Sequence, residues 1–272
     1  IVAYPKKPTD CTKNKYKNHS QCTATSTSTS TETPFPLKMA LIFIENKKIS
    51  SDAYILSHSV AENLLKGWDV EYATYGEINK KLDSSIDLYV QPGSNGATYN
   101  IMKKFKSKGE EKTIENWVNN GGKYLGLCMG AFLAMGYKSG PSAPYDPGFG
   151  FVFQDNDELW ELSRIGLLEV QDSVKIFVED GPRILASQLD EQEIYSKFPK
   201  DYFSEAKGTL VNSFIKKVNQ GWVGLVAGHY EADNGKLAGH QYLDWEIDNY
   251  SNELMLENWR IGTDFIKELM KK

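Results

Sequence analysis

Apolar runs alternate with amphipathic stretches along the first half of the chain. The run MALIFIE (39–45) is apolar up to its last residue, as expected of a strand buried on both faces of a sheet. The segment 51–67 that follows has apolar residues at helical spacing. Ser51 or Asp52 can cap its start, and Gly67 can end it. These two stretches predict a strand followed by a helix.

The same alternation continues to residue 136. Further strands are predicted over 68–74, 86–93 and 123–128, and helices over 98–108, 110–122 and from 129 onward. Strands that alternate with helices at this spacing predict an α/β fold. We expect a mostly parallel sheet of flavodoxin or Rossmann type, with helices on both faces.

Beyond a Pro- and Gly-rich stretch (137–160) the pattern changes to short strands, some paired as late β-hairpin additions. They are predicted over 165–170, 173–179, 221–231 and 236–242. The turn Asp233-Asn234-Gly235 predicts that the last two form a hairpin. A final helix is predicted over about 251–270, where apolar residues again recur at helical spacing.

The first 36 residues differ in composition from the rest. Five lysines against two acidic residues give this arm a charge of +3, so the remainder carries −8 if the whole chain is at −5. The arm also holds the tract TATSTSTSTET (23–33), which is similar to O-glycosylated stalks. We therefore predict a polar Ser/Thr-rich N-terminal arm over 1–36 and one α/β domain over 37–272.

Cysteines and sequons bear on the cellular compartment. Cys11 and Cys22 lie close together in the arm, where a disulfide loop would stabilise a segment with little apolar content. Asn18 and Asn249 each begin an Asn-x-Ser sequon for N-glycosylation. These features predict a secreted or secretory-pathway protein. The alternative is a cytoplasmic protein with a disordered tail and three free thiols.

Composition argues against several classes of protein. A chain of 272 residues with 40% hydrophobic content can bury a sizeable core. The net charge of −5 argues against a nucleic-acid partner, and the lack of an 18-residue apolar run predicts no membrane span. The sequence has neither metal-ligand spacing of Cys and His nor a phosphate loop, so no metal or cofactor is predicted. The chain begins at Ile1 without an initiator Met, as expected of a mature or trimmed chain.

The stretch GGKYLGLCMGAFLAMG (121–136) places one cysteine in a tight bend between a strand and a helix. Gly126 and Gly130 flank Cys128 at i−2 and i+2, as small residues must where the two backbones approach closely. This is the arrangement of a nucleophile elbow, with sulfur in place of oxygen. The helix that begins near Met129 would favour a thiolate and offer N–H groups to an oxyanion. The alternative is a packed core thiol.

Three stretches carry a resemblance to a known family. IENWVNNGGKYLGLCMGAFLAM (114–135) resembles the nucleophile region of the class I glutamine amidotransferase-like superfamily, and most closely that of the biotin–protein ligase N-terminal domain family. DLYVQPGSNGATYN (87–100) resembles the family's upstream Pro-Gly-Gly turn, and MALIFIE resembles its first strand. The resemblance implies that 37–272 is a class I glutamine amidotransferase-like domain.

The resemblance also implies roles for particular residues. Cys128 would be the nucleophile, and backbone N–H groups of the Gly93-Ser94 turn and of Met129 would form the oxyanion hole. Ser94 stands where the family usually has a second glycine. In the glyoxalase- and deglycase-like branch an acid near the end of the first strand bonds to the cysteine, which makes Glu45 a further candidate.

A cysteine that attacks an amide needs a proton acceptor, generally a His that a carboxylate orients. In the family this His follows a late strand, in a His-Pro-Glu pattern. KLAGHQYLDWE (236–246) occupies that place, so we predict His240 as the base and Asp244 as its carboxylate. The alternates are His229 and Glu231, which match the His-x-Glu spacing better but precede the predicted last strand.

Together these features predict a cysteine-dependent, amidotransferase-like hydrolase. Its substrate would be an amide or related carbonyl in a small molecule or peptide. One alternative is a non-catalytic ligand- or protein-binding module on the same fold, which the broken His-Pro-Glu pattern favours. Another is a glyoxalase- or deglycase-like lyase that uses Cys128 and Glu45. The sequence leaves open the substrate, the oligomeric state and any association with a ligase domain.

Overall fold

The protein is described here from a computed structural model. The described residues are 38–49, 51–94, 98–137, 148–154, 165–170, 174–179, 181–199, 208–233 and 250–272. Contacts divide the chain into two units, Ile1–Pro36 and Leu37–Lys272, and the structure below is that of the second. The predicted disulfide and glycosylation sites lie outside the described residues; they are Cys11, Cys22, Asn18 and Asn249.

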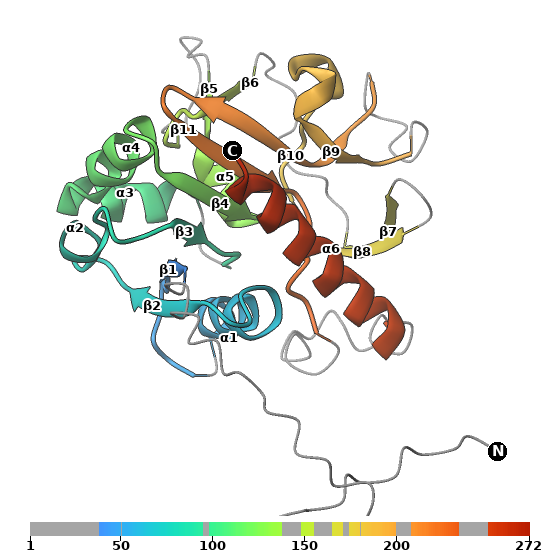
Figure 1. Cartoon of the computed structure of the whole chain (residues 1–272), viewed down its shortest axis with the longest axis horizontal. Helices are drawn as coiled ribbons and strands as arrows, with labels where there is room; N and C mark the ends of the chain where they lie inside the picture. The colour runs from blue at the N-terminus through green and yellow to red at the C-terminus, as the bar shows by residue number, and fades with distance from the viewer. Residues whose placement is uncertain are drawn as a thin grey trace, which may run out of the picture. The chain divides into compact units, whose positions relative to one another are not determined.

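A seven-stranded sheet forms the centre of the domain (Figure 1). In order across the sheet the strands are β2 (Asp69–Ala73), β1 (Met39–Phe43), β3 (Leu88–Gln91), β4 (Lys123–Leu127), β11 (Gly221–Val226), β10 (Val211–Val218) and β9 (Ile194–Lys197). The first five are mutually parallel, β10 pairs antiparallel with β11, and β9 pairs antiparallel with β10. The predicted α/β fold with a mostly parallel sheet is confirmed.

Helices cover both faces of this sheet, each through its own hydrophobic cluster. One face carries α1 (Asp52–Ser59), its continuation as the π-helical turn η2 (Val60–Leu64), and α6 (Asn252–Met270). The other carries α2 (Ile78–Lys81), α3 (Thr98–Lys108), α4 (Glu110–Asn119) and α5 (Met129–Ala134). Of the two predicted caps for α1, Ser51 is the one whose side chain accepts a bond, from the Tyr54 N–H. None of the helices in the described ranges combines the length and apolar character that a bilayer crossing requires.

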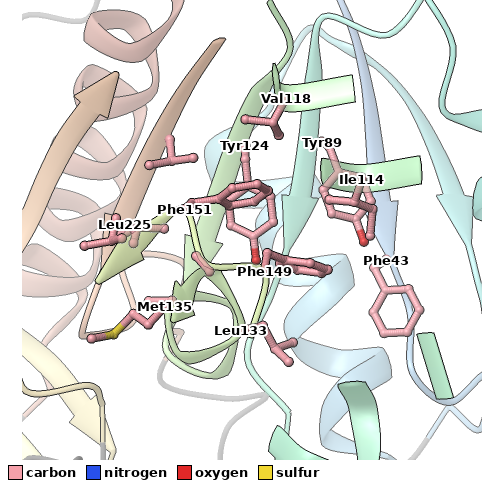
Figure 2. Close-up of a cluster of buried hydrophobic side chains, with 14 of the residues drawn as sticks. Phe43, Tyr89, Ile114, Val118, Tyr124, Leu133, Met135, Phe149, Phe151 and Leu225 are labelled. Atoms are coloured by element: carbon pink, nitrogen blue, oxygen red, sulfur yellow. The ribbon is translucent and has the colours of Figure 1, made fainter. Parts of the chain in front are cut away.

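An aromatic cluster fills the face covered by α3, α4 and α5 (Figure 2). Tyr89 and Tyr124 are fully buried on adjacent strands, and Phe149 and Phe151 pack beside Tyr124. The Tyr124 hydroxyl donates to the Gly130 carbonyl at 2.6 Å, so this core also anchors the first turn of α5. The core therefore holds in place the helix that follows Cys128.

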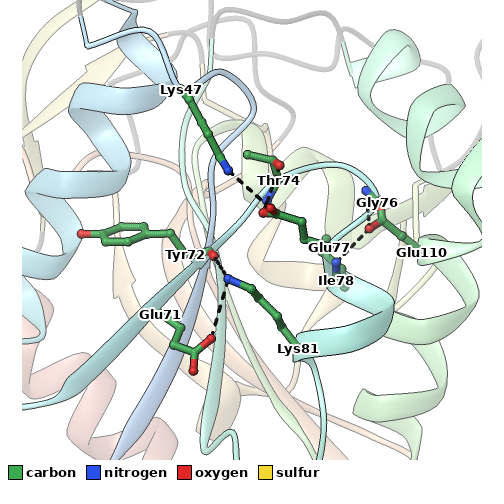
Figure 3. A network of polar contacts seen from close by, with 9 residues as sticks. All are labelled: Lys47, Glu71, Tyr72, Thr74, Gly76, Glu77, Ile78, Lys81 and Glu110. Carbon is green, nitrogen blue, oxygen red and sulfur yellow. Dashed lines mark hydrogen bonds and ion pairs between the residues drawn. The ribbon is translucent and has the colours of Figure 1, made fainter.

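A polar network fixes the loop after β2 (Figure 3). Glu110, at the start of α4, accepts hydrogen bonds from the backbone of Gly76 at 2.7 Å and of Ile78 at 2.9 Å. Glu77 accepts from the Thr74 N–H. Burial raises the pKa of the Glu110 carboxyl despite these donors. Glu110 therefore ties α2 to α4.

The late strands differ in part from the predictions. The predicted strands at 165–170 and 173–179 form a separate antiparallel hairpin, β7 (Ile165–Val170) and β8 (Val174–Glu179). Strands β9 and β10 were not predicted. The strand predicted over 221–231 ends at Val226 as β11, which has β4 on one edge and β10 on the other. The other predicted strand of that hairpin, 236–242, lies outside the described residues. The β10–β11 turn contains Asn219, whose φ of 53° lies in the left-handed region.

The shorter elements also depart from the pattern. Helix α5 ends at Ala134, and Met135 begins strand β5. The remaining elements are β5 (Met135–Tyr137) with its partner β6 (Val152–Gln154), and the 3₁₀ turns η4 (Ala186–Gln188) and η5 (Glu191–Glu193).

Candidate active site

Three parallel strands bring the candidate site together. β3, β4 and β11 are neighbours in the sheet and run in the same direction. Their carboxyl ends therefore lie at one edge, where open α/β sheets bind ligands. Gly93 follows β3, Cys128 follows β4 and His229 follows β11.

Cys128 occupies the bend between β4 and α5 with φ of 48° and ψ of −106°. A non-glycine residue at positive φ is strained, and such strain persists only where the surroundings enforce it. Here the Cys128 N–H donates to the Val226 carbonyl at 2.9 Å, and the Cys128 carbonyl accepts from Ala131 at 2.9 Å. The side chain is partly exposed. The predicted nucleophile-elbow geometry is present at this residue.

The two flanking glycines are needed for space. A Cβ on Gly130 would lie 1.8 Å from the Gln91 carbonyl oxygen at the end of β3. A Cβ on Gly126 would lie 2.6 Å from the Gly130 carbonyl oxygen. These contacts are with backbone atoms, which cannot turn aside as a side chain would. The first turn of α5 is thus packed directly on β3 and β4.

His229 reaches the same edge from β11. Its N–H donates to the Phe177 carbonyl of β8 at 2.8 Å, and its side chain is only 2% exposed. A Cβ on Gly93 would lie 2.8 Å from Cε1 of the imidazole. Because Gly93 has no side chain, the imidazole ring can pack directly against the turn after β3.

Glu231 holds one nitrogen of this ring. Its Oε1 lies 2.9 Å from His229 Nδ1, and the carboxyl is fully buried. The Glu231 backbone carbonyl accepts from the Asn63 side chain of η2 at 2.9 Å. With Nδ1 bound to the carboxylate, Nε2 is the nitrogen left for proton exchange.

Cys128 and His229 interact electrostatically. Burial alone lowers the pKa of the His229 imidazole, but Cys128 and Glu231, as negative charges and hydrogen-bond partners, raise that pKa well above its usual value. Nε2 is buried and forms no hydrogen bond of ordinary geometry. The sulfur and the imidazole are therefore neighbours at this edge of the sheet.

The predicted oxyanion turn lies beside these residues. Gly93 is buried against the imidazole, and the Ser94 hydroxyl donates a short hydrogen bond to Glu45. The other Glu45 oxygen lies 3.7 Å from Lys104 Nζ. Met129, which follows the cysteine, accepts a bond at its sulfur from Thr98 at 3.1 Å. Glu45 is thus engaged with Ser94 and Lys104.

The structure brings Cys128 together with His229 and Glu231, the two residues predicted as alternates for the base and its carboxylate. His240 and Asp244 lie outside the described residues, and their roles stay a prediction. His229 is the second choice from the sequence, because the turn signal at Asp233-Asn234-Gly235 predicts a further strand after it. The His-x-Glu spacing was the signal that pointed to it. No group of three or more His, Cys, Asp or Glu in the described ranges could hold a metal ion.

Comparison with known proteins supports the resemblance. Residues 54–138 match the family described as biotin-protein ligase, N terminal. This segment is less than half of the chain; it includes Gly93 and Cys128 and ends before His229. The resemblance predicted from the sequence is confirmed over this segment. Among curated proteins, none matches the chain.

Solved structures with a similar chain path include a glutamine amidotransferase from Thermotoga maritima. Its TM-score is 0.48 at 12% identity, over 86% of this chain and 99% of that one. An exo-β-1,4-mannosidase from an Opitutaceae bacterium has a TM-score of 0.38 at 10% identity, over 79% of this chain and 35% of that one. A β-galactosidase from Rahnella sp. R3 has a TM-score of 0.37 at 10% identity, over 86% of this chain and 31% of that one. The chain thus spans about a third of each glycosidase. The fold assignment rests on the strand order described above.

Proposed function

We propose that this protein is a cysteine-dependent, amidotransferase-like hydrolase that acts on an amide or related carbonyl. Cys128 is the nucleophile, His229 the general base and acid, and Glu231 the residue that orients the imidazole. The observation that carries the proposal is the strained Cys128 elbow beside a buried His229 whose Nδ1 is bound to Glu231 at 2.9 Å. A nucleophile, its base and an orienting carboxylate are the minimum set for acyl transfer.

The reaction would proceed in two steps. The Cys128 thiol gives its proton to His229 Nε2, and the sulfur attacks the carbonyl carbon. The imidazolium then protonates the leaving nitrogen as the C–N bond breaks, which leaves a thioester and releases an amine or ammonia. In the second step His229 takes a proton from water and the hydroxide attacks the thioester carbon. The C–S bond then breaks, the carboxylic acid leaves, and the imidazolium returns its proton to the sulfur.

Backbone groups would stabilise the oxyanion in both steps. The Met129 N–H belongs to the residue that follows Cys128 at the start of α5, and the Gly93-Ser94 turn after β3 lies against the His229 imidazole. Donors already fixed in place stabilise developing charge without reorganisation, which is the main source of rate enhancement at such sites. The hydrogen bond from Ser94 to Glu45 ties this turn to the residue that follows β1.

The lyase alternative needs Glu45 against the sulfur, but Glu45 accepts from Ser94 and pairs with Lys104. The binding-module alternative was favoured by the broken pattern around His240. His229 and Glu231 keep the His-x-Glu spacing and its geometry, so the hydrolase is the better supported function.

The test is covalent capture by a panel of amide and ester electrophiles, followed by intact-mass measurement. Wild type should form a Cys128 acyl adduct that turns over, and Cys128→Ser and His229→Ala should not. His58→Ala is the matched control, because His58 stacks between Tyr54 and Tyr72, and it should behave like wild type. His240→Ala should also behave like wild type. Capture lost in His240→Ala but kept in His229→Ala would overturn the assignment of the base.

A further inference from the structure

A cluster of buried polar side chains lies behind the His229 loop, away from the reacting atoms. Asn212 and Ser213 on β10, Ser196 on β9 and Tyr230 are all 7% exposed or less. Polar groups in a core are unfavourable unless they are fully hydrogen-bonded, and a satisfied network rigidifies its surroundings. The proposed reaction makes no use of this cluster.

One side chain of the cluster binds both neighbours of His229. Asn212 Oδ1 accepts from the Gly228 N–H at 3.3 Å, and Asn212 Nδ2 donates to the Tyr230 hydroxyl at 2.9 Å. The Asn212 backbone carbonyl also accepts from Ala227 at 2.7 Å. A single residue of β10 therefore fixes the chain immediately before and after the imidazole.

The Tyr230 hydroxyl is held in turn by the serines. It lies 3.0 Å from Ser213 Oγ and 3.3 Å from Ser196 Oγ. Burial raises the pKa of the Tyr230 phenol to about 12, against the lowering effect of these hydrogen bonds. The phenol stays neutral at working pH, so it can act as donor and acceptor at once.

The loop is confined from the opposite side by β8. The His229 N–H is bound to the Phe177 carbonyl, and a Cβ on Gly228 would lie 2.8 Å from that oxygen and 3.3 Å from Asn212 Oδ1. Only a glycine therefore fits at position 228, between Phe177 of β8 and Asn212 of β10. The backbone of residues 228–230 therefore cannot shift without breaking one of these contacts.

We infer that Asn212 and Tyr230 are positioning residues that hold the His229 imidazole in reach of the Cys128 sulfur. The inference rests on the proposed function, since it assigns the cluster a role in the same proton transfer. A misplacement of about 1 Å at a catalytic group can lower a rate by roughly a hundredfold. Loss of the hydrogen bonds of Asn212 or Tyr230 should therefore change the reaction rate measurably.

The test is the pH profile of Cys128 alkylation by iodoacetamide, with the free energy of unfolding measured in parallel. Tyr230→Phe removes the hydroxyl and keeps the ring. It should slow alkylation at pH 7 by roughly tenfold and move the profile towards that of His229→Ala. Tyr195→Phe is the matched control, because it removes the same hydroxyl from a tyrosine that packs on the same Phe265 ring as Tyr230 but is not a member of the cluster. Its profile should overlay that of wild type even if it loses stability.

Two results separate the claims. A Tyr230→Phe profile that overlays wild type, with His229→Ala shifted, would overturn the positioning role and leave the proposed function standing. A His229→Ala profile equal to wild type would overturn the proposed function itself. Asn212→Ala removes no aromatic packing and gives the same test if Tyr230→Phe does not fold; it too should shift the profile.

Discussion

At the residue scale, the site depends on a strained cysteine and on glycines that leave room for it. Cys128 has φ of 48°, and a Cβ on Gly130 would meet the Gln91 carbonyl. The close approach of β3 to α5 keeps the elbow in this conformation. The shape of the bend thus depends on Gln91 and Gly130, which take no part in the proposed reaction.

We predict that Gly130→Ala destabilises the protein by about 3 kcal/mol, because its Cβ would overlap a backbone oxygen that cannot move aside. The added methyl group would lie 1.8 Å from the Gln91 oxygen. Gly208→Ala is the control, since its Cβ would meet only Leu185 at an ordinary 3.5 Å. Urea unfolding of both variants checks this; equal midpoints would contradict the packing described.

Glu231→Gln tests the electrostatics of the imidazole. The folded pKa of His229 is raised above its usual 6.5, so its contribution to stability is fully present below about pH 6.5 and is lost as pH rises through the folded value. Because Glu231 is one cause of the rise, the variant has a lower His229 pKa.

The stability of wild type relative to Glu231→Gln should therefore fall as pH rises above neutrality. The change should be about 1.4 kcal/mol for each unit by which the two His229 pKa values differ. Denaturant unfolding from pH 6 to 10 measures this difference. A constant or rising difference over that range would show that Glu231 does not act through the imidazole charge.

At the element scale, local pattern predicts the elbow at Cys128 but not the strand pairing that brings His229 to the same edge of the sheet. The glycines, the strand and the helix around Cys128 lie within one stretch of sequence, so spacing alone predicted the bend. The placement of His229 depends on β11 pairing with β4, about a hundred residues away, and on β10 taking the other edge. Asn234-Gly235 is a strong local hairpin signal, and it led to the expectation of a further strand after His229. Strand partners cannot be derived from periodicity, and the choice between His229 and His240 depended on them.

Glu110 gives a second pH prediction, at the junction of α2 and α4. Its carboxyl pKa is raised by burial, so the folded state loses stability as pH rises from the usual value near 4.5 through the raised value. Glu110→Gln keeps an oxygen for the Gly76 and Ile78 donors and removes the charge. We expect wild type to lose stability relative to this variant between pH 4 and 7. Parallel unfolding curves across that range would contradict the cause assigned to the shift.

At the scale of the whole molecule, the arm and the domain are separate units. We predict that removal of residues 1–36 leaves the unfolding midpoint and the alkylation rate of Cys128 unchanged, because each element of the site lies between residues 37 and 272. Full-length and shortened protein can be compared by thermal unfolding and by alkylation. A drop in either quantity would mean that the arm contributes to the domain.

We propose secretion for the full chain, on the basis of the arm and the sequons. The native protein should then carry a Cys11–Cys22 disulfide, glycans at Asn18 or Asn249, or both, and peptide mass mapping under non-reducing conditions detects them. Three free thiols and unmodified asparagines would support the cytoplasmic alternative.

The reactivity of Cys128 in the folded protein tests the central claim most directly. Iodoacetamide should alkylate Cys128 in native protein at pH 7 faster than it alkylates glutathione, with the site of labelling mapped by peptide mass. His229→Ala should remove this advantage, because the proton acceptor is gone. If Cys128 in native wild type is labelled only after denaturation, the sulfur is a buried structural thiol and the proposed hydrolase is wrong.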